Sequence, residues 1–133
     1  MAGETTAALS ADVPVELPAG LFLVPFTVAY ATTQLELNDV MQLGYLPAGV
    51  TVYGIVYSPT DMDTNVSPAV VQKVTIGSTD VATGLTGAQT GAKSFVGIVP
   101  TTLTAKTLAS VTTTTVPGTA AAGTLYCAFL CQK

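Results

Sequence analysis

The sequence predicts an all-β fold: an antiparallel β-sandwich or jelly roll with an extended N-terminal arm. Short runs of apolar, β-branched and aromatic residues recur along the chain, separated by Gly, Pro, Asn, Asp and Ser. No stretch sustains the apolar period of an amphipathic helix. Strands joined by turns are therefore expected throughout.

The chain has 133 residues and is expected to form one domain with an extension. Residues 1–18 are polar or small, and their two prolines favour extended backbone over helix. The part of this arm that holds Val13, Val15 and Leu17 is suited to lie along a neighbouring subunit as an added edge strand. Residues 19–133 are predicted to form a single β-sandwich domain.

The first strand is expected at residues 21–32, where Pro25 places it at a sheet edge or at a bulge. Residues 33–41 fit either a short helix or an extended segment, because the leucines match both periods. A second strand at residues 40–46 ends at the turn sequence Pro-Ala-Gly of residues 47–49.

Residues 50–57 give the clearest strand signal. Both faces of this strand are apolar, so it is predicted to be central in a sheet and covered on both sides. Tyr53, Ile55 and Tyr57 are expected to share one of its faces. A polar loop follows at residues 58–68.

Residues 70–76 alternate between apolar and polar side chains, as a strand with one solvated face does, and Gln72 is the exception on the apolar face. Residues 77–91 are rich in Gly, Ser, Thr and Asp, which predicts a long exposed loop. A short strand at residues 95–99 is expected to stop at Pro100.

The last part of the chain predicts two further segments. Residues 103–116 are rich in threonine and fit one strand or a strand pair, ended by the Pro-Gly of residues 117–118. Residues 125–131 are apolar on both faces and are expected to close the fold as a strand.

The two cysteines, Cys127 and Cys131, lie in this last segment. In an extended strand they are about 13 Å apart, and a disulfide needs Cα atoms within about 7 Å. Without histidine or further cysteines they do not form a typical zinc site. Two buried thiols that pack as small hydrophobic groups are predicted, as in a chain folded in a reducing cytosol.

The amino-acid composition argues against several classes of function. The chain has no histidine, arginine or tryptophan, and only 9% of its residues are charged, with a formal net charge of −4. Such a chain is poor in proton-transfer groups and lacks the basic clusters that nucleic acids and anionic lipids require. No enzyme activity, cofactor, nucleic-acid partner or membrane partner is expected. Because low charge promotes association, the surface is expected to be partly covered by other subunits.

One apolar run, residues 21–31, is shorter than the about 20 residues of a membrane-spanning helix. The segment before it is acidic rather than basic, so no signal peptide is predicted.

Two loops resemble ligand-binding motifs. Residues 61–65, Asp-Met-Asp-Thr-Asn, place oxygen ligands at alternate positions, as a calcium loop does. The later glycine and glutamate of an EF-hand are missing, so a solvated loop whose Asx side chains cap its own backbone is the first interpretation, and a weak structural cation site the second. Residues 87–94 resemble a phosphate-binding loop only faintly, because Ala92 separates the glycine from Lys93.

Exposed apolar and aromatic residues are the remaining candidates. Tyr53 and Tyr57 on one strand face fit a subunit interface, where tyrosine is enriched, or a platform that stacks on carbohydrate. The predicted contact residues, all apolar or aromatic, are Val13, Val15, Leu17, Phe22, Tyr53 and Tyr57.

The segment Asn38 to Tyr53, with its Leu-Pro-Ala-Gly turn, resembles the opening of small virion proteins of tailed bacteriophages. The acidic loop with Asp61 and Asp63, and the closing segment 121–126, extend the resemblance. These proteins are capsid decoration (cement) proteins and related small β-sandwich head proteins. The resemblance implies a homo-oligomer, commonly a trimer, seated on the major capsid protein, and it carries over no catalytic, cofactor or metal-binding residue.

The sequence therefore predicts a non-enzymatic virion structural protein that is made in the host cytoplasm and binds the outer surface of the phage head. Two alternatives remain within the phage: a receptor- or glycan-binding module of a fibre or tail, and another head–tail component. A pilin- or adhesin-type subunit is a third, but it needs export.

Overall fold

The computed structural model describes residues 20–133. The arm predicted at residues 1–18, with the contact residues Val13, Val15 and Leu17, lies outside the described residues.

Within residues 20–133, eight strands form two four-stranded sheets, and all neighbouring strands are antiparallel. In spatial order, the first sheet contains β1 (Leu21–Tyr30), β8 (Gly123–Gln132), β3 (Thr51–Pro59) and β6 (Ser94–Thr102). The second sheet contains β2 (Val40–Leu46), β7 (Thr107–Thr115), β4 (Val71–Ile76) and β5 (Thr79–Leu85). Two single 3₁₀ turns complete the elements: η2 (Thr32–Gln34) and η3 (Gly87–Gln89).

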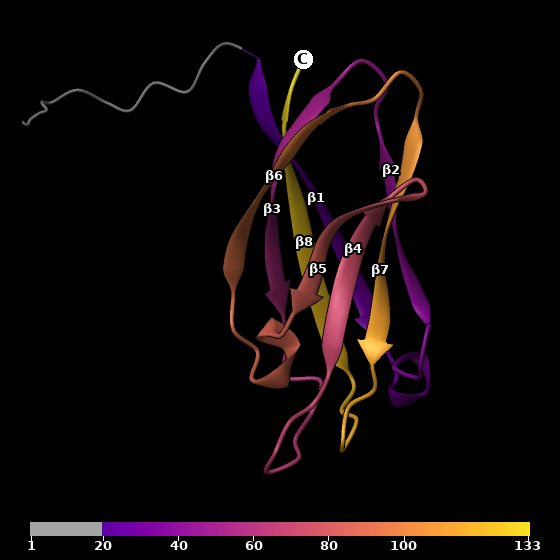
Figure 1. Cartoon of the computed structure of the whole chain (residues 1–133), viewed down its shortest axis with the longest axis vertical. Helices are drawn as coiled ribbons and strands as arrows, with labels where there is room; N and C mark the ends of the chain where they lie inside the picture. Colours follow the sequence, from indigo (N-terminus) through magenta and orange to yellow (C-terminus); the bar gives the residue numbers. More distant parts are fainter. Residues whose placement is uncertain (1–19) are drawn as a thin grey trace, which may run out of the picture.

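The two sheets pack face to face (Figure 1), which confirms the predicted β-sandwich. Successive strands change sheets at every connection except the β4–β5 hairpin. The resulting strand orders, β1-β8-β3-β6 and β2-β7-β4-β5, are those of an eight-stranded jelly roll.

Two of the three prolines within strands lie on sheet edges, and the third, Pro59, is the last residue of the central strand β3. Pro25 lies in β1, at one edge of the first sheet, as the sequence predicts. Pro100 lies within β6, at the opposite edge of the same sheet, so the strand predicted to stop there continues to Thr102. An edge strand tolerates proline because one side of its backbone needs no ladder hydrogen bond.

The prediction of a long loop at residues 77–91 is wrong. A two-residue turn at Gly77 and Ser78 joins β4 to a further strand, β5, and η3 follows. The small polar residues of β5 resemble a loop in composition, but they lie on a sheet edge, where most of them are exposed to solvent. Residues 103–116 contain one strand, β7, rather than a pair. The helix considered at residues 33–41 does not form.

The core lies between the sheets and includes fully buried side chains from both. β8 is flanked by β1 and β3 and turns Leu125, Cys127, Phe129 and Cys131 inward. Both cysteines are free and buried, as predicted. Burial raises the pKa of Cys127 to about 12 and that of Cys131 to about 11, so both thiols stay protonated near neutral pH.

Candidate interaction surface

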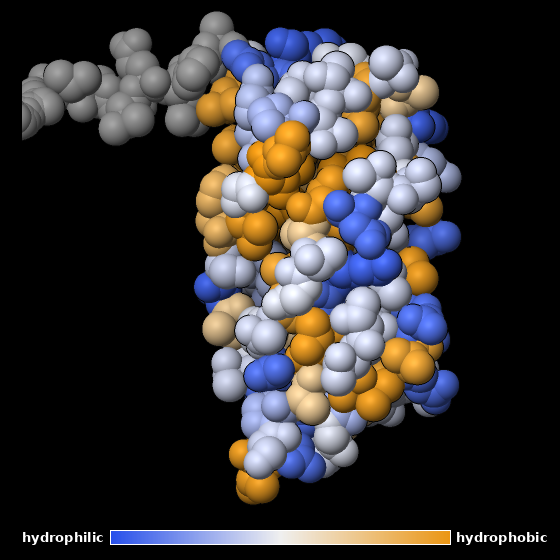
Figure 2. Space-filling view, viewed as in Figure 1, coloured by the Kyte–Doolittle hydropathy of each residue, from blue (hydrophilic) through white to orange (hydrophobic). Residues whose placement is uncertain are grey.

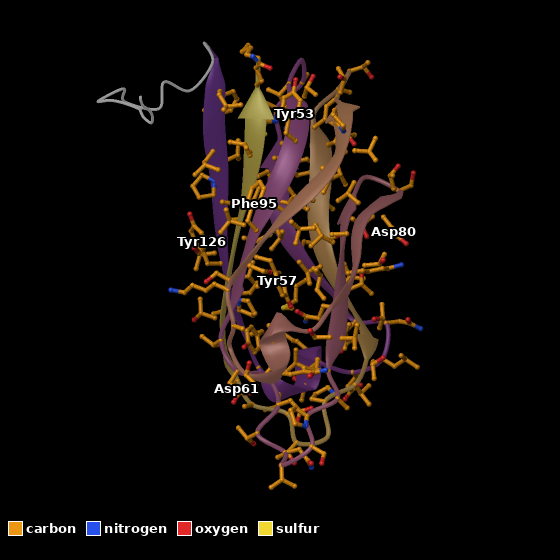
Figure 3. All side chains as sticks on the ribbon, turned by 60° about the vertical axis from the view of Figure 1, so that its left-hand side comes forward. Tyr53, Tyr57, Asp61, Asp80, Phe95 and Tyr126 are labelled. Atoms are coloured by element: carbon orange, nitrogen blue, oxygen red, sulfur yellow. The ribbon has the colours of Figure 1, made fainter. Side chains whose placement is uncertain are left out.

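The outer face of the first sheet carries no charge, because none of its four strands contains Asp, Glu, Lys or Arg. Four large apolar or aromatic side chains are exposed on it: Leu23 at 51%, Tyr53 at 36%, Phe95 at 59% and Tyr126 at 39%. Figure 3 shows Tyr53, Phe95 and Tyr126 along this face. We call these four residues, with Pro25, the uncharged face.

Strand register makes this face continuous. One row across the sheet pairs apolar residues of all four strands: Pro25, Ala128, Val56 and Phe95. The next row contains Leu23, Leu130, Gly54 and Gly97. The Phe95 ring lies so close over Gly54 that a side chain there would collide with it. The face is therefore an apolar surface that spans the whole width of the sheet.

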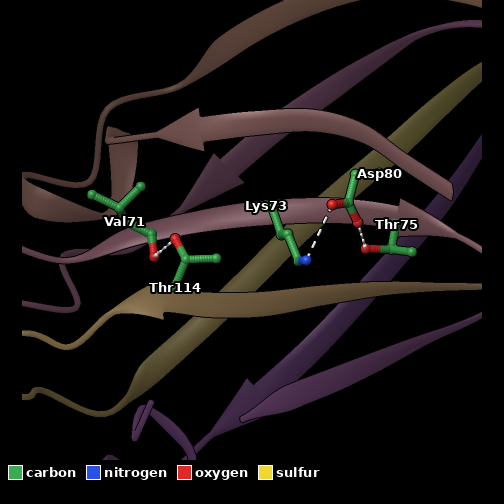
Figure 4. Close-up of polar contacts among 5 residues, drawn as sticks. All are labelled: Val71, Lys73, Thr75, Asp80 and Thr114. Atoms are coloured by element: carbon green, nitrogen blue, oxygen red, sulfur yellow. Dashed lines mark hydrogen bonds and ion pairs between the residues drawn. The ribbon is translucent and has the colours of Figure 1, made fainter. Parts of the chain in front are cut away.

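The outer face of the second sheet is different. Ser110, Thr112 and Thr114 alternate outward along β7, and Lys73 on β4 forms an ion pair with Asp80 on β5 at 3.1 Å. The Thr75 hydroxyl donates to the other oxygen of Asp80 at 3.1 Å, and the Thr114 hydroxyl donates to the carbonyl of Val71 at 3.1 Å (Figure 4). This polar face carries the charged pair and the hydroxyls, with Val40 at 55% and Tyr45 at 56% exposed beside them on β2, whereas the outer face of the first sheet is uncharged.

A bulge in β3 overturns the predicted aromatic stripe. The register shifts between Val52 and Gly54, so Tyr53 points outward while Ile55 and Tyr57 point into the core. Tyr57 is fully buried, and the contact role predicted for it is wrong. β3 is central in its sheet as expected, but nothing in the described residues covers its outer side at Tyr53, which is 36% exposed.

The buried Tyr57 hydroxyl donates to Oε1 of Gln72, and Nε2 of Gln72 contacts the Thr113 hydroxyl at 3.4 Å. Burial is the main cause that raises the pKa of Tyr57 far above its usual value. Gln72, the exception in the alternation of its strand, therefore lies inside and satisfies a tyrosine of the opposite sheet.

Phe22 also differs from its predicted role. It lies on the inner side of β1, half-buried and packed against the core, together with Val24, Phe26 and Val28. Phe26 makes an edge-to-face contact with Phe129 at a centroid distance of 5.9 Å. The exposed position of this strand belongs to the next residue, Leu23.

The Asp61–Asn65 loop is held by hydrogen bonds to its own backbone. Asp61 accepts from the amide of Asp63 at 2.9 Å, and Asn65 accepts from the amide of Ser67 at 3.0 Å. These are Asx turns, so the geometry favours the self-capped loop over a cation site. Among residues 20–133, no group of three or more His, Cys, Asp or Glu side chains is placed to hold a metal ion.

Asp63 is the exceptional residue of this loop, because it is buried and charged. Its carboxylate accepts from backbone amides of two separate loops, at distances from 2.7 to 3.3 Å: those of Asn65, Ala69, Val70, Gly118 and Thr119. Burial alone would raise the pKa of Asp63, but these amides outweigh burial and hold the pKa well below its usual range. The residue fastens the β3–β4 loop to the β7–β8 loop.

The described part of the chain has no helix long and apolar enough to cross a membrane. The glycine-rich residues 87–94 form η3 and a turn, and Ala88 of η3 is buried while its carbonyl accepts from the amide of Met62 at 2.8 Å. This segment packs against the sandwich, whereas the sequence predicts an exposed loop at residues 77–91.

Comparison with known proteins gives structural matches alone. No protein-family model matches the chain, and no curated protein does. A chain from the capsid asymmetric unit of cyanophage Pam1 is similar over 96% of both chains, with a TM-score of 0.73 and 20% identity. A chain from the capsid of Ralstonia phage GP4 is similar over 91% of this chain and 88% of its own, with a TM-score of 0.68 and 17% identity. The protein therefore shares its jelly-roll fold, over nearly its whole length, with proteins from two phage capsids.

Proposed function

We propose that the protein is a structural component of a phage virion: a decoration (cement) protein that binds the outer surface of the head and stabilises the shell. The observation that carries this proposal is the uncharged face, a continuous apolar surface on a fold shared with two phage capsid chains. The protein is made in the host cytoplasm and joins the assembled head.

The mechanism is the burial of apolar surface rather than chemistry. Each square ångström removed from water contributes about 25 cal/mol. The partner in this proposal is the major capsid protein, which covers Leu23, Tyr53, Phe95 and Tyr126. Copies assemble as a homo-oligomer, a trimer if the family resemblance holds. Several weak contacts on one rigid lattice then act together, so the assembly dissociates far more slowly than a single contact.

The polar face is suited to solvent. Its threonines and its Lys73–Asp80 ion pair remain hydrated at little cost, whereas the uncharged face gains from being covered. In this arrangement the first sheet faces the shell and the second sheet faces outward.

The glycan-binding alternative depended on Tyr53 and Tyr57 sharing a strand face. Tyr57 is buried and Tyr53 points to the other side, so that platform is not present.

Heating of intact particles tests the proposal. Phage particles assembled without this protein are compared with complete particles, and genome release is followed with a DNA-binding dye. The proposal predicts release at a lower temperature from the depleted particles, and restoration when purified protein is added back. Identical release temperatures would contradict a cement role.

A further inference from the structure

The two lateral sides of the sandwich are closed to different degrees. On the β1–β2 side, the Phe26 ring packs directly against the backbone of Gly44 and closes the core. On the β5–β6 side, the inward side chains Val81 and Ile98 are only partly buried. Figures 1 and 2 look onto this second side, where hydrophobic atoms gather in the upper half of the view.

A groove lies between β5 and β6 on this open side. Its volume is about 290 Å³, and its lining residues are Thr79, Asp80, Val81, Ile98, Val99 and Thr101. β6 bulges at this point, because Val52 pairs with Thr101 and Gly54 pairs with Gly97. The bulge leaves Val99 84% exposed, an unusual state for a valine in a strand.

Both strands that border the groove are sheet edges. Among residues 20–133, β5 pairs with β4 alone and β6 pairs with β3 alone, so each has one side of its backbone without a strand partner in this part of the chain. Such an edge is a template for a further strand. β5 contains no proline, unlike β6, and can therefore donate along its whole edge.

We infer that this groove binds residues 12–17 of a neighbouring copy, which add as a strand along β5. The segment reads Asp-Val-Pro-Val-Glu-Leu, so its odd positions, Val13, Val15 and Leu17, project from one face of an extended chain. These side chains enter the groove and complete the open side of the core. The even positions, Asp12, Pro14 and Glu16, face solvent, and a proline suits this outermost strand.

Chain length assigns the segment to a neighbouring copy. Leu21 of β1 and Thr102 of β6 lie in the same row across the first sheet, because Leu21 pairs with Gln132, Gln132 with Thr51, and Thr51 with Thr102. Three interstrand spacings of about 4.8 Å separate the two edges, about 14 Å in a straight line. The four residues from Leu17 to Leu21 extend over about 14 Å at most. A path around the end of the sandwich is longer than that, so a chain cannot lay its own segment into its own groove.

Cross-linking of purified protein tests the inference without any capsid. Val15→Cys and Val99→Cys chains, carrying tags of different length, are mixed and treated with a short bismaleimide. The native cysteines are fully buried and do not compete. We expect dimers that contain both tags to form at least ten times faster than in the control mixture of Val15→Cys with Val66→Cys. Val66 is fully exposed, but it lies in the loop that follows the end of β3. Val99 lies beside the start of β3, at the opposite end of that strand.

Two further variants sharpen the test without changing the sandwich. Val13→Asp with Leu17→Asp, added to the Val15→Cys chain, is expected to lower the rate to that of the control mixture. Ala7→Asp with Ala8→Asp adds the same charge and is expected to leave the rate unchanged. Equal rates at Val99 and Val66, or cross-links only within one chain in a Val15→Cys/Val99→Cys double variant, would overturn the inference. Because no capsid is present, either result is independent of the proposed cement role.

Discussion

Asp63 is a single buried charge that contributes to the stability of the fold in a chain with few charges. Backbone amides that donate to the Asp63 carboxylate replace the water molecules it loses on burial. A hydrogen bond to a charged group contributes about 1.5–3 kcal/mol to the free energy of unfolding. This side chain joins two loops at one end of the sandwich, beside backbone hydrogen bonds from Thr64 to Thr119 and from Ala121 to Met62. The sequence marked it only as part of an Asx-rich loop, because nothing local indicates that the β7–β8 loop, more than fifty residues away, supplies donors.

Replacing Asp63 with Asn is expected to destabilise the fold by about 3 kcal/mol, because an NH₂ group then faces backbone donors. The effect depends on pH. The folded-state pKa of Asp63 is depressed, so its contribution is complete above the unfolded pKa of about 4 and is lost as the pH falls below that value. Urea unfolding at a series of pH values should show a constant difference between wild type and Asp63→Asn above about pH 5 and a smaller one towards pH 2. Asp61→Asn serves as the exposed control, and a difference that does not narrow in acid would contradict this role.

The Tyr57–Gln72 pair gives a second prediction at this scale. Tyr57→Phe leaves the buried Oε1 of Gln72 without its donor and is expected to cost about 1–3 kcal/mol. Adding Gln72→Leu removes the unsatisfied group, so the double variant is expected to be more stable than Tyr57→Phe alone. Denaturant titration of the three proteins measures this. A double variant less stable than the single one would mean that Gln72 acts through other contacts.

The strands illustrate how far local pattern determines an element. The alternation of residues 70–76 predicts β4, and the proline in β1 correctly predicts an edge strand. β5 has the composition of a loop and becomes a strand only because β4 offers it a partner. The bulge in β3 has no signal in the alternation, since both of its faces are apolar. That bulge decides which tyrosine reaches the surface, so the uncharged face could not be read correctly from the sequence.

Gly44, at the bulge of β2, is a further test at the element scale. Its φ is +154°, and a side chain there would collide with the Phe26 ring. Gly44→Ala is expected to destabilise the fold by about 2 kcal/mol or more, because it reopens the closed side of the sandwich. Gly97→Ala is the matched control, since no atom lies within 4 Å of the added carbon. The unfolding midpoints in urea compare the two, and equal shifts would show that the Phe26 contact is not what requires glycine.

At the scale of the whole molecule, the charged residues of the strands are unevenly distributed between the two sheets. The described strands keep their charges on the second sheet, and the proposed function makes the uncharged first sheet the one that is covered by protein. The low charge content of the sequence predicts a covered surface, but only the strand order shows which residues form it.

A charge placed on the uncharged face is therefore expected to weaken binding to the shell. Leu23→Glu with Tyr126→Glu should reduce co-sedimentation with capsids that lack the protein by at least tenfold, because two carboxylates would be desolvated. Gln42→Glu with Thr83→Glu adds the same charge at exposed positions of the second sheet and should bind as wild type. Equal binding by both double variants would show that another surface contacts the shell.

The central claim is that this molecule acts as a fixed part of the outside of a phage head. A three-dimensional image reconstruction of the native particle tests it most directly. We predict density on the outer surface of the head that fits the jelly roll, with Leu23, Phe95 and Tyr126 towards the capsid protein. Density for this chain only in the tail or fibres, or none in the mature particle, would contradict the account.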